Sequence, residues 1–130
     1  IAGYYSLGEE IWSQTKGEID AFVHCVGTAA SSRGVATVLK RHKPSIKIVA
    51  VEPAESSVLL GGQAGPHQIE GVGIGYTPPL WEPSLVDEIL PVKTDDAIQV
   101  AKRLGPAAKV VTLMADSGLK YLSTDVYRGR

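Results

Sequence analysis

Five consecutive small residues, Gly27-Thr28-Ala29-Ala30-Ser31, have the composition of an anion-binding turn. Small side chains let the backbone come close to a ligand, and the hydroxyls of Thr28 and Ser31 add hydrogen-bond donors. A helix is expected to begin here, so its first N–H groups and the positive end of its dipole would face the ligand. This chemistry suits a phosphate or another anion. The alternative is an ordinary strand-to-helix turn that uses Ser and Thr as caps.

A second glycine run, Gly71-Val72-Gly73-Ile74-Gly75, lies in an irregular part of the sequence. It differs from the dinucleotide fingerprint G-x-G-x-x-G, which stands between a strand and a helix. Here Tyr76-Thr77-Pro78-Pro79 continues the loop, and no helical pattern follows. If the run is functional, its glycines would place backbone without side chains beside a flat ligand.

The remaining reactive side chains do not define a catalytic or metal site. His24, His42 and His67 lack metal-ligand spacing with one another and with Cys25, the single cysteine. His24 and Cys25 are expected to pack in a buried strand, whereas His67 lies in the glycine-rich loop and is the one candidate site histidine. No Ser-His-Asp arrangement is supported by the spacing. The sequence therefore predicts no catalytic residue and no metal ligand.

The elements around the first turn form a βαβ unit. Ala21–Val26 is an apolar run typical of a buried strand, Ser31–His42 has helical spacing, and Ile46–Val51 is a second apolar run. Pro44 ends the helix between them. Strand, helix and strand in about 30 residues predict a parallel pair with a right-handed crossover.

The same reasoning extends to the rest of the chain. Further elements are a short helix over Gly8–Gln14 with Ile11 and Trp12 on one side, an irregular stretch over Pro53–Pro83, a strand over Asp87–Val92, a helix from Thr94 to Leu104 and a strand over Lys109–Ala115. Pro91 indicates that the third strand lies at an edge or ends early, because proline cannot donate to a sheet. The predicted fold is α/β, with a mainly parallel sheet and helices on both faces.

Composition limits the class of protein. The 130 residues are enough for one domain. Hydrophobic residues make up 44% of the chain and charged residues 21%, a composition that excludes collagen, coiled coil and general disorder. A net charge of -1 does not favour nucleic acid, and no apolar run reaches the roughly 20 residues of a membrane span. One cysteine fits a reducing compartment. We expect one partial domain over 1–130 in a soluble, cytoplasmic protein. The chain opens with Ile1 and not with Met, so we also expect that its natural start is missing.

Five motifs, in the right order, resemble the C-terminal half of cysteine synthase and its relatives, including cystathionine β-synthase. These are pyridoxal-phosphate enzymes of the tryptophan-synthase-β fold type. The matching runs are Gly8–Trp12 (TGPEIW in the family), Asp20–Ser31 (DAFVAGVGTGGT), Val51–Ser56 (VEPAES), Gly65–Tyr76 (GPHKIQGIGAGF) and Asp116–Thr124 (PDSGERYLST). Each motif alone is weakly specific, whereas five in order point to the family.

The resemblance implies a cofactor site and a reaction. The residues that it assigns to pyridoxal 5'-phosphate are Gly27, Thr28, Ala29, Ala30 and Ser31 for the phosphate, and Gly71 and Gly73 beside the ring. His67, Glu52 and Ser117 lie in matching motifs and are given structural roles. The implied reaction is β-replacement on an activated serine of the O-acetylserine type, giving cysteine or a related thioether amino acid. Complete family members are usually homodimers.

The chain also departs from the family pattern. Ala29 and Ala30 replace two glycines of GTGGT, which puts any backbone angle restricted to glycine in question. The Schiff-base lysine and an S-G-N loop belong to the N-terminal half, and the G-x-S-S-G stretch expected after Leu104 is missing. We therefore expect this chain to supply only the phosphate-binding part and to be inactive alone. The alternatives are an inactive fragment or pseudo-enzyme that binds a partner, and a different small-anion-binding α/β domain.

Overall fold

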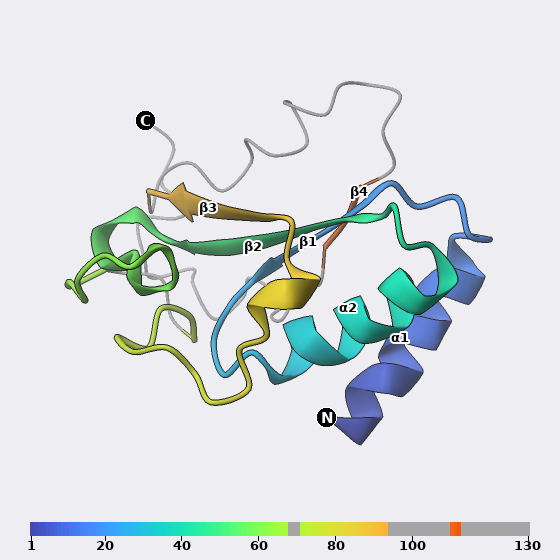
Figure 1. Ribbon diagram of the computed structural model, residues 1–130, viewed down its shortest axis with the longest axis horizontal. Helices are drawn as coiled ribbons and strands as arrows, with labels where there is room; N and C mark the ends of the chain where they lie inside the picture. The colour runs from blue at the N-terminus through green and yellow to red at the C-terminus, as the bar shows by residue number, and fades with distance from the viewer. Residues whose placement is uncertain (68–70, 94–109, 113–130) are drawn as a thin grey trace, which may run out of the picture.

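The computed structural model describes residues 1–67, 71–93 and 110–112 (Figure 1). The helices and strands, in chain order, are α1 (Ala2–Gln14), β1 (Ala21–Cys25), α2 (Ala30–His42), β2 (Lys47–Pro53), β3 (Glu88–Val92) and β4 (Val110–Thr112), with three short 3-10 helices η1 (Ala54–Ser56), η2 (Val58–Leu60) and η3 (Pro83–Leu85) between β2 and β3. The predicted helix from Thr94 to Leu104 lies outside the described residues.

The four strands form one parallel sheet in the order β3-β2-β1-β4. Val23 lies opposite Val49 on β2 and Thr112 on β4, so β1 is a central strand. The predicted βαβ unit is confirmed, although α2 begins one residue earlier than expected and β2 continues to Pro53. Among the described strands β3 lies at an edge, as predicted, and its Pro91 pairs in register with Glu52.

Both described helices pack on the same side of the sheet, which Figure 1 shows below the strands. The core between them and the sheet consists of Ile11, Ile19, Phe22, Val35, Ala36, Leu39, Ile46 and Ile48. The α/β class with a parallel sheet is therefore confirmed, and both described helices cover one face of it. No helix in the described ranges is long and apolar enough to cross a membrane.

Helix α1 begins at Ala2, six residues before the predicted start at Gly8. Glycine and tyrosine are modest helix formers, so the first turn gives little local signal. The helix extends because it crosses α2 at close range: a Cβ on Gly34 would collide with the Tyr4 Cβ, and a Cβ on Gly8 would lie 2.7 Å from the Val38 Cβ. Tertiary packing therefore sets the start of α1.

Asp87 connects three elements immediately before β3. Its carboxylate accepts hydrogen bonds from Lys40 Nζ on α2, at 2.7 and 2.9 Å, and from the Ile48 N–H on β2 at 2.7 Å. Burial alone would raise the pKa of Asp87. The hydrogen bonds from Lys40 and Ile48, together with the charges of Lys40 and Lys47, outweigh burial and hold the pKa below its ordinary value.

Replacing Gly34 with alanine tests the close helix crossing. The added methyl group collides with Tyr4, and overpacking of this kind costs about 1–3 kcal/mol, more than the helix propensity that alanine adds. Gly3→Ala is the matched control, because no atom lies within 4 Å of a Cβ at that helical position. Urea unfolding is expected to show a lower free energy of unfolding for G34A only; equal values for both variants would contradict the crossing.

Replacing Asp87 with asparagine tests the ion pair by its pH dependence. A carboxyl whose folded pKa is lowered stabilises the fold above its unfolded pKa, and this contribution is lost as the pH falls through the folded pKa. The Asp87 side chain is 40% exposed, so solvent screening limits the expected loss at neutral pH to about 1 kcal/mol. Unfolding curves from neutral to acid pH should fall less steeply for D87N; parallel curves would rule out this role.

Candidate functional site

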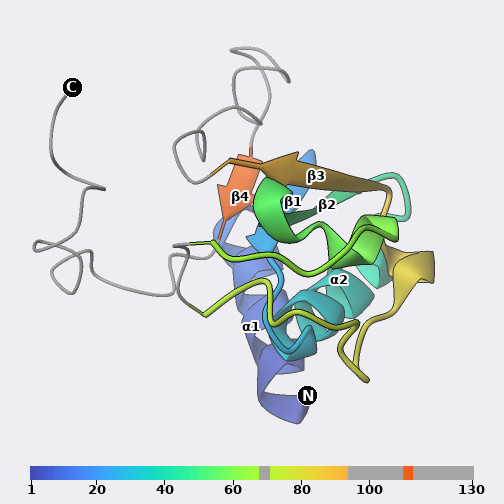
Figure 2. The same cartoon turned by 90° about the vertical axis from the view of Figure 1, so that its left-hand side faces the viewer.

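The predicted anion-binding turn lies where β1 ends and α2 begins. The Val26 N–H donates to the Val51 carbonyl at 3.0 Å, which prolongs the pairing of β1 with β2 by one residue. The chain then leaves the sheet and enters α2 at Ala30. Figure 2 shows the carboxyl ends of the strands, where the segment after β2 and the glycine-rich loop also lie. Because the strands are parallel, their carboxyl ends bring these loops together.

The start of α2 is open to a ligand. Among the described residues no side chain caps it, and the first N–H groups of a helix have no partner within the helix. Thr28 is exposed, and Ser31 is partly buried in the first turn. The turn therefore combines free backbone donors, two hydroxyls and the positive end of a 13-residue helix. This set of donors fits a phosphate group.

The two alanines that replace family glycines are not equivalent. Ala29 has φ 66° and ψ 2°, the left-handed conformation, which favours glycine. Ala30 is already helical, so alanine is acceptable there. The backbone angle that the two alanines put in question therefore exists at one position, and Ala29 adopts it while its side chain is buried near Val26.

The structure brings the second glycine run against this turn. A Cβ on Gly27 would lie 2.5 Å from the Gly71 carbonyl oxygen, and the Gly73 N–H donates to the Val26 carbonyl at 3.1 Å. Gly71 and Gly73 both have positive φ, at 78° and 61°. All seven residues assigned to the cofactor from the sequence thus lie in one turn and the loop that touches it.

Neighbouring side chains hold this loop in place. His67 Nε2 donates to the Gly73 carbonyl at 2.9 Å, so the histidine binds the backbone of the loop. Glu52 is buried at the end of β2, and its carboxylate accepts the N–H groups of Leu59 and Leu60 at 2.8 and 3.1 Å. These contacts agree with the structural roles expected for His67 and Glu52. Ser117 lies outside the described residues.

Sequence reasoning missed one contact of the turn. His24 was expected only to pack, but its Nε2 lies 2.7 Å from Ser31 Oγ. The side chain is 9% exposed, and burial lowers its pKa below the ordinary value. His24 also lies seven residues before Ser31, a spacing that no local motif connects. Only the pairing of strand and helix reveals the contact.

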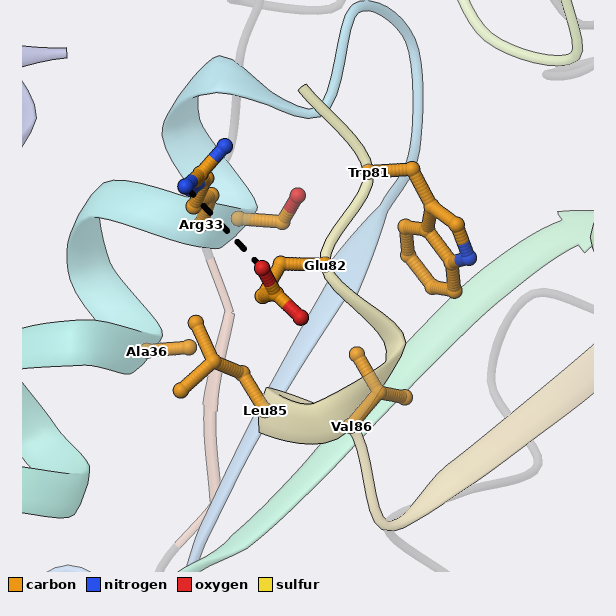
Figure 3. Close-up of a pocket in the computed structure, with 7 residues that line it drawn as sticks. Arg33, Ala36, Trp81, Glu82, Leu85 and Val86 are labelled. Carbon is orange, nitrogen blue, oxygen red and sulfur yellow. Dashed lines mark ion pairs between the residues drawn. The ribbon is translucent and has the colours of Figure 1, made fainter. Parts of the chain in front are cut away.

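A small pocket beside α2 is separate from this site (Figure 3). Its lining is mainly apolar and includes Trp81, Leu85 and Val86, which belong to η3 and the residues on either side of it. Arg33 and Glu82 form an ion pair at 3.9 Å across it. None of the seven sequence-assigned residues lines the pocket, which we interpret as a packing gap. The described residues also contain no cluster of three or more His, Cys, Asp or Glu side chains able to hold a metal ion.

A parallel α/β sheet with a glycine-rich loop against a helix N-terminus is an arrangement that suits a domain holding a phosphate-bearing cofactor. Comparison with known proteins identifies which class: the family "Pyridoxal-phosphate dependent enzyme" matches residues 1–123. The chain belongs to this family. The resemblance found in the sequence is thereby confirmed, and the cofactor of the family is pyridoxal phosphate.

Three similar proteins carry the names cysteine synthase or O-acetylserine sulfhydrylase. Cysteine synthase 3 of Caenorhabditis elegans is 47% identical over 103 residues, covering 79% of this chain and 31% of that enzyme. Cysteine synthase of Staphylococcus aureus is 37% identical over 149 residues, covering 94% and 48%. The structure of O-acetylserine sulfhydrylase isoform 3 from Entamoeba histolytica superposes with a TM-score of 0.87 at 36% identity, covering 98% and 46%. The chain thus spans about a third to a half of these relatives.

The left-handed residue of the turn can be tested by exchanging alanine for glycine. A29G removes a strained backbone angle, which costs about 1–2 kcal/mol, and loses a buried methyl group worth about 0.8 kcal/mol. Together with the extra chain entropy of glycine, about 0.4–1 kcal/mol, these terms nearly cancel, so A29G should keep the free energy of unfolding within about 1 kcal/mol of the wild-type value. A30G is the matched control and should lower it, because Ala30 is helical. Urea unfolding in which both variants lose stability equally would contradict the left-handed assignment.

Proposed function

We propose that this chain supplies the phosphate-binding part of a cysteine synthase-like enzyme that depends on pyridoxal 5'-phosphate. The substrate class is an activated serine of the O-acetylserine type, and the product is cysteine or a related thioether amino acid. The observation that carries the proposal is the contact between Gly27 and the Gly71 carbonyl, which unites the two sequence-assigned segments in a chain of this family.

The residues present fit the cofactor phosphate. Its oxygens would accept hydrogen bonds from the first N–H groups of α2 and from the hydroxyls of Thr28 and Ser31. Gly71 and Gly73 would lie beside the ring, where side chains are absent and the backbone can approach closely. When bound, pyridoxal phosphate withdraws electrons from the substrate amino acid, so that a group on its β-carbon can be exchanged for a thiol.

This chain contributes binding and orientation rather than proton transfer. No residue of the chain is assigned as the Schiff-base lysine, and the G-x-S-S-G motif is not present in the sequence. The alignment with the Staphylococcus aureus enzyme extends over more positions, 149, than the 130 residues of this chain, which supports an internal shortening. We therefore propose one partial cofactor domain over 1–130 that is inactive by itself.

Assembly and location complete the proposal. We propose that the complete enzyme acts in the cytoplasm as a homodimer on a small amino-acid substrate, as the family resemblance implies. An inactive pseudo-enzyme that binds a partner is the second candidate. The two differ in cofactor binding, because a pseudo-enzyme need not retain affinity for pyridoxal phosphate.

Titration calorimetry on the full chain tests the phosphate assignment. Pyridoxal 5'-phosphate should bind at least tenfold more tightly than pyridoxal, and inorganic phosphate should compete with it. Gly27→Ala should weaken binding of the phosphate ester at least tenfold, because the added Cβ displaces the Gly71 carbonyl. Gly3→Ala is the control, with no atom near its Cβ. Equal affinity for pyridoxal and its phosphate ester would refute the assignment, and phosphate binding without pyridoxal phosphate binding would favour a general anion site.

A further inference from the structure

His24 extends from the central strand into the first turn of α2. Its Nε2 lies 2.7 Å from Ser31 Oγ, within ordinary hydrogen-bond distance. The imidazole ring is nearly buried and lies beside the ring of Phe22, with centroids 5.6 Å apart and planes inclined by 29°. On the neighbouring strand, Ala50 lies opposite His24 in the register. The histidine is therefore held by packing on the sheet and bonds the turn at one atom.

The direction of this hydrogen bond determines what Ser31 offers to a ligand. A hydroxyl has one hydrogen and two lone pairs, and a neutral imidazole donates from one nitrogen and accepts at the other. If Nε2 accepts, the Ser31 hydrogen points back at His24 and is lost to the ligand. If Nε2 donates, a Ser31 lone pair is occupied and the hydrogen is free to point at an anion. The same 2.7 Å contact therefore leaves the Ser31 hydrogen available to a ligand in one orientation and unavailable in the other.

We propose that His24 is a positioning residue whose Nε2–H donates to Ser31 Oγ and directs the Ser31 hydroxyl hydrogen toward the bound phosphate. This inference rests on the proposed function, because it takes Ser31 as a phosphate donor. His24 touches neither the phosphate nor the ring; it acts through Ser31. The contact joins the last residues of β1 to the turn that also carries Ala29 and Ala30.

The direction of the bond agrees with the charge of the ligand. A phosphate accepts hydrogen bonds only, so every hydroxyl that touches it must donate. A second donor behind Ser31 keeps that hydroxyl from rotating away, and it also polarises the O–H bond toward the anion. Because His24 is nearly buried on the sheet, the protein fixes the position of the donor behind the partly buried Ser31.

Substitution of both partners in the full chain tests the inference. His24→Phe keeps an aromatic ring without the donor and should weaken binding of pyridoxal 5'-phosphate about fivefold to tenfold by calorimetry. His24→Gln places an amide donor near the position of Nε2 and should restore affinity to within about twofold. In a Ser31→Ala background, His24→Phe should cause no further loss, because His24 acts only through Ser31.

A spectroscopic measurement separates positioning from a purely structural role. In the wild-type chain saturated with inorganic phosphate or pyridoxal 5'-phosphate, the ¹⁵N resonances of His24 should show a hydrogen on Nε2. An unprotonated Nε2 in either bound state overturns the inference even if H24F does not fold. Three binding results also overturn the inference. H24F could bind as tightly as the wild type, or H24F and H24Q could lose the same affinity. The third is a double variant of His24→Phe and Ser31→Ala whose loss of affinity equals the sum of the two single losses. If the wild-type chain itself binds neither compound, the proposed function fails instead.

Discussion

The approach of the Gly71–Gly73 backbone to the Val26–Gly27 backbone is the constraint on which the candidate site depends. One contact is a hydrogen bond from the Gly73 N–H to the Val26 carbonyl, and the other places the Gly71 oxygen where a Cβ of residue 27 would be. Two backbones can come this close only where side chains are absent. The contact closes one side of the anion-binding turn and holds the loop beside it.

The surrounding structure supports that contact from both sides. His67 binds the Gly73 carbonyl, and a Cβ on Gly73 would collide with Pro53 at the end of β2. Glu52, one residue earlier, holds the segment that follows β2 through two backbone N–H groups. These motif residues around the site therefore act by holding the backbone in position.

The turn forms a left-handed residue and a helix start with alanine at both positions. Ala29 accepts a left-handed angle, while Ala30 serves as an ordinary first residue of the helix. Ser31 keeps a hydroxyl at the position of the family threonine and forms a contact with His24. Backbone N–H groups carry most of the recognition of a phosphate, so side chains can change as long as the backbone path is preserved.

The sequence alone determined the order of strands and helices, the position of the turn and the edge location of β3, because hydrophobic periodicity and proline act locally. It also determined the family, since the motifs are runs of neighbouring residues. Only the tertiary structure decided that α1 begins at Ala2, that Gly71 lies against Gly27, and that His24 bonds Ser31. These features join segments that are separate in the chain, and their geometry depends on packing distances that no local pattern encodes.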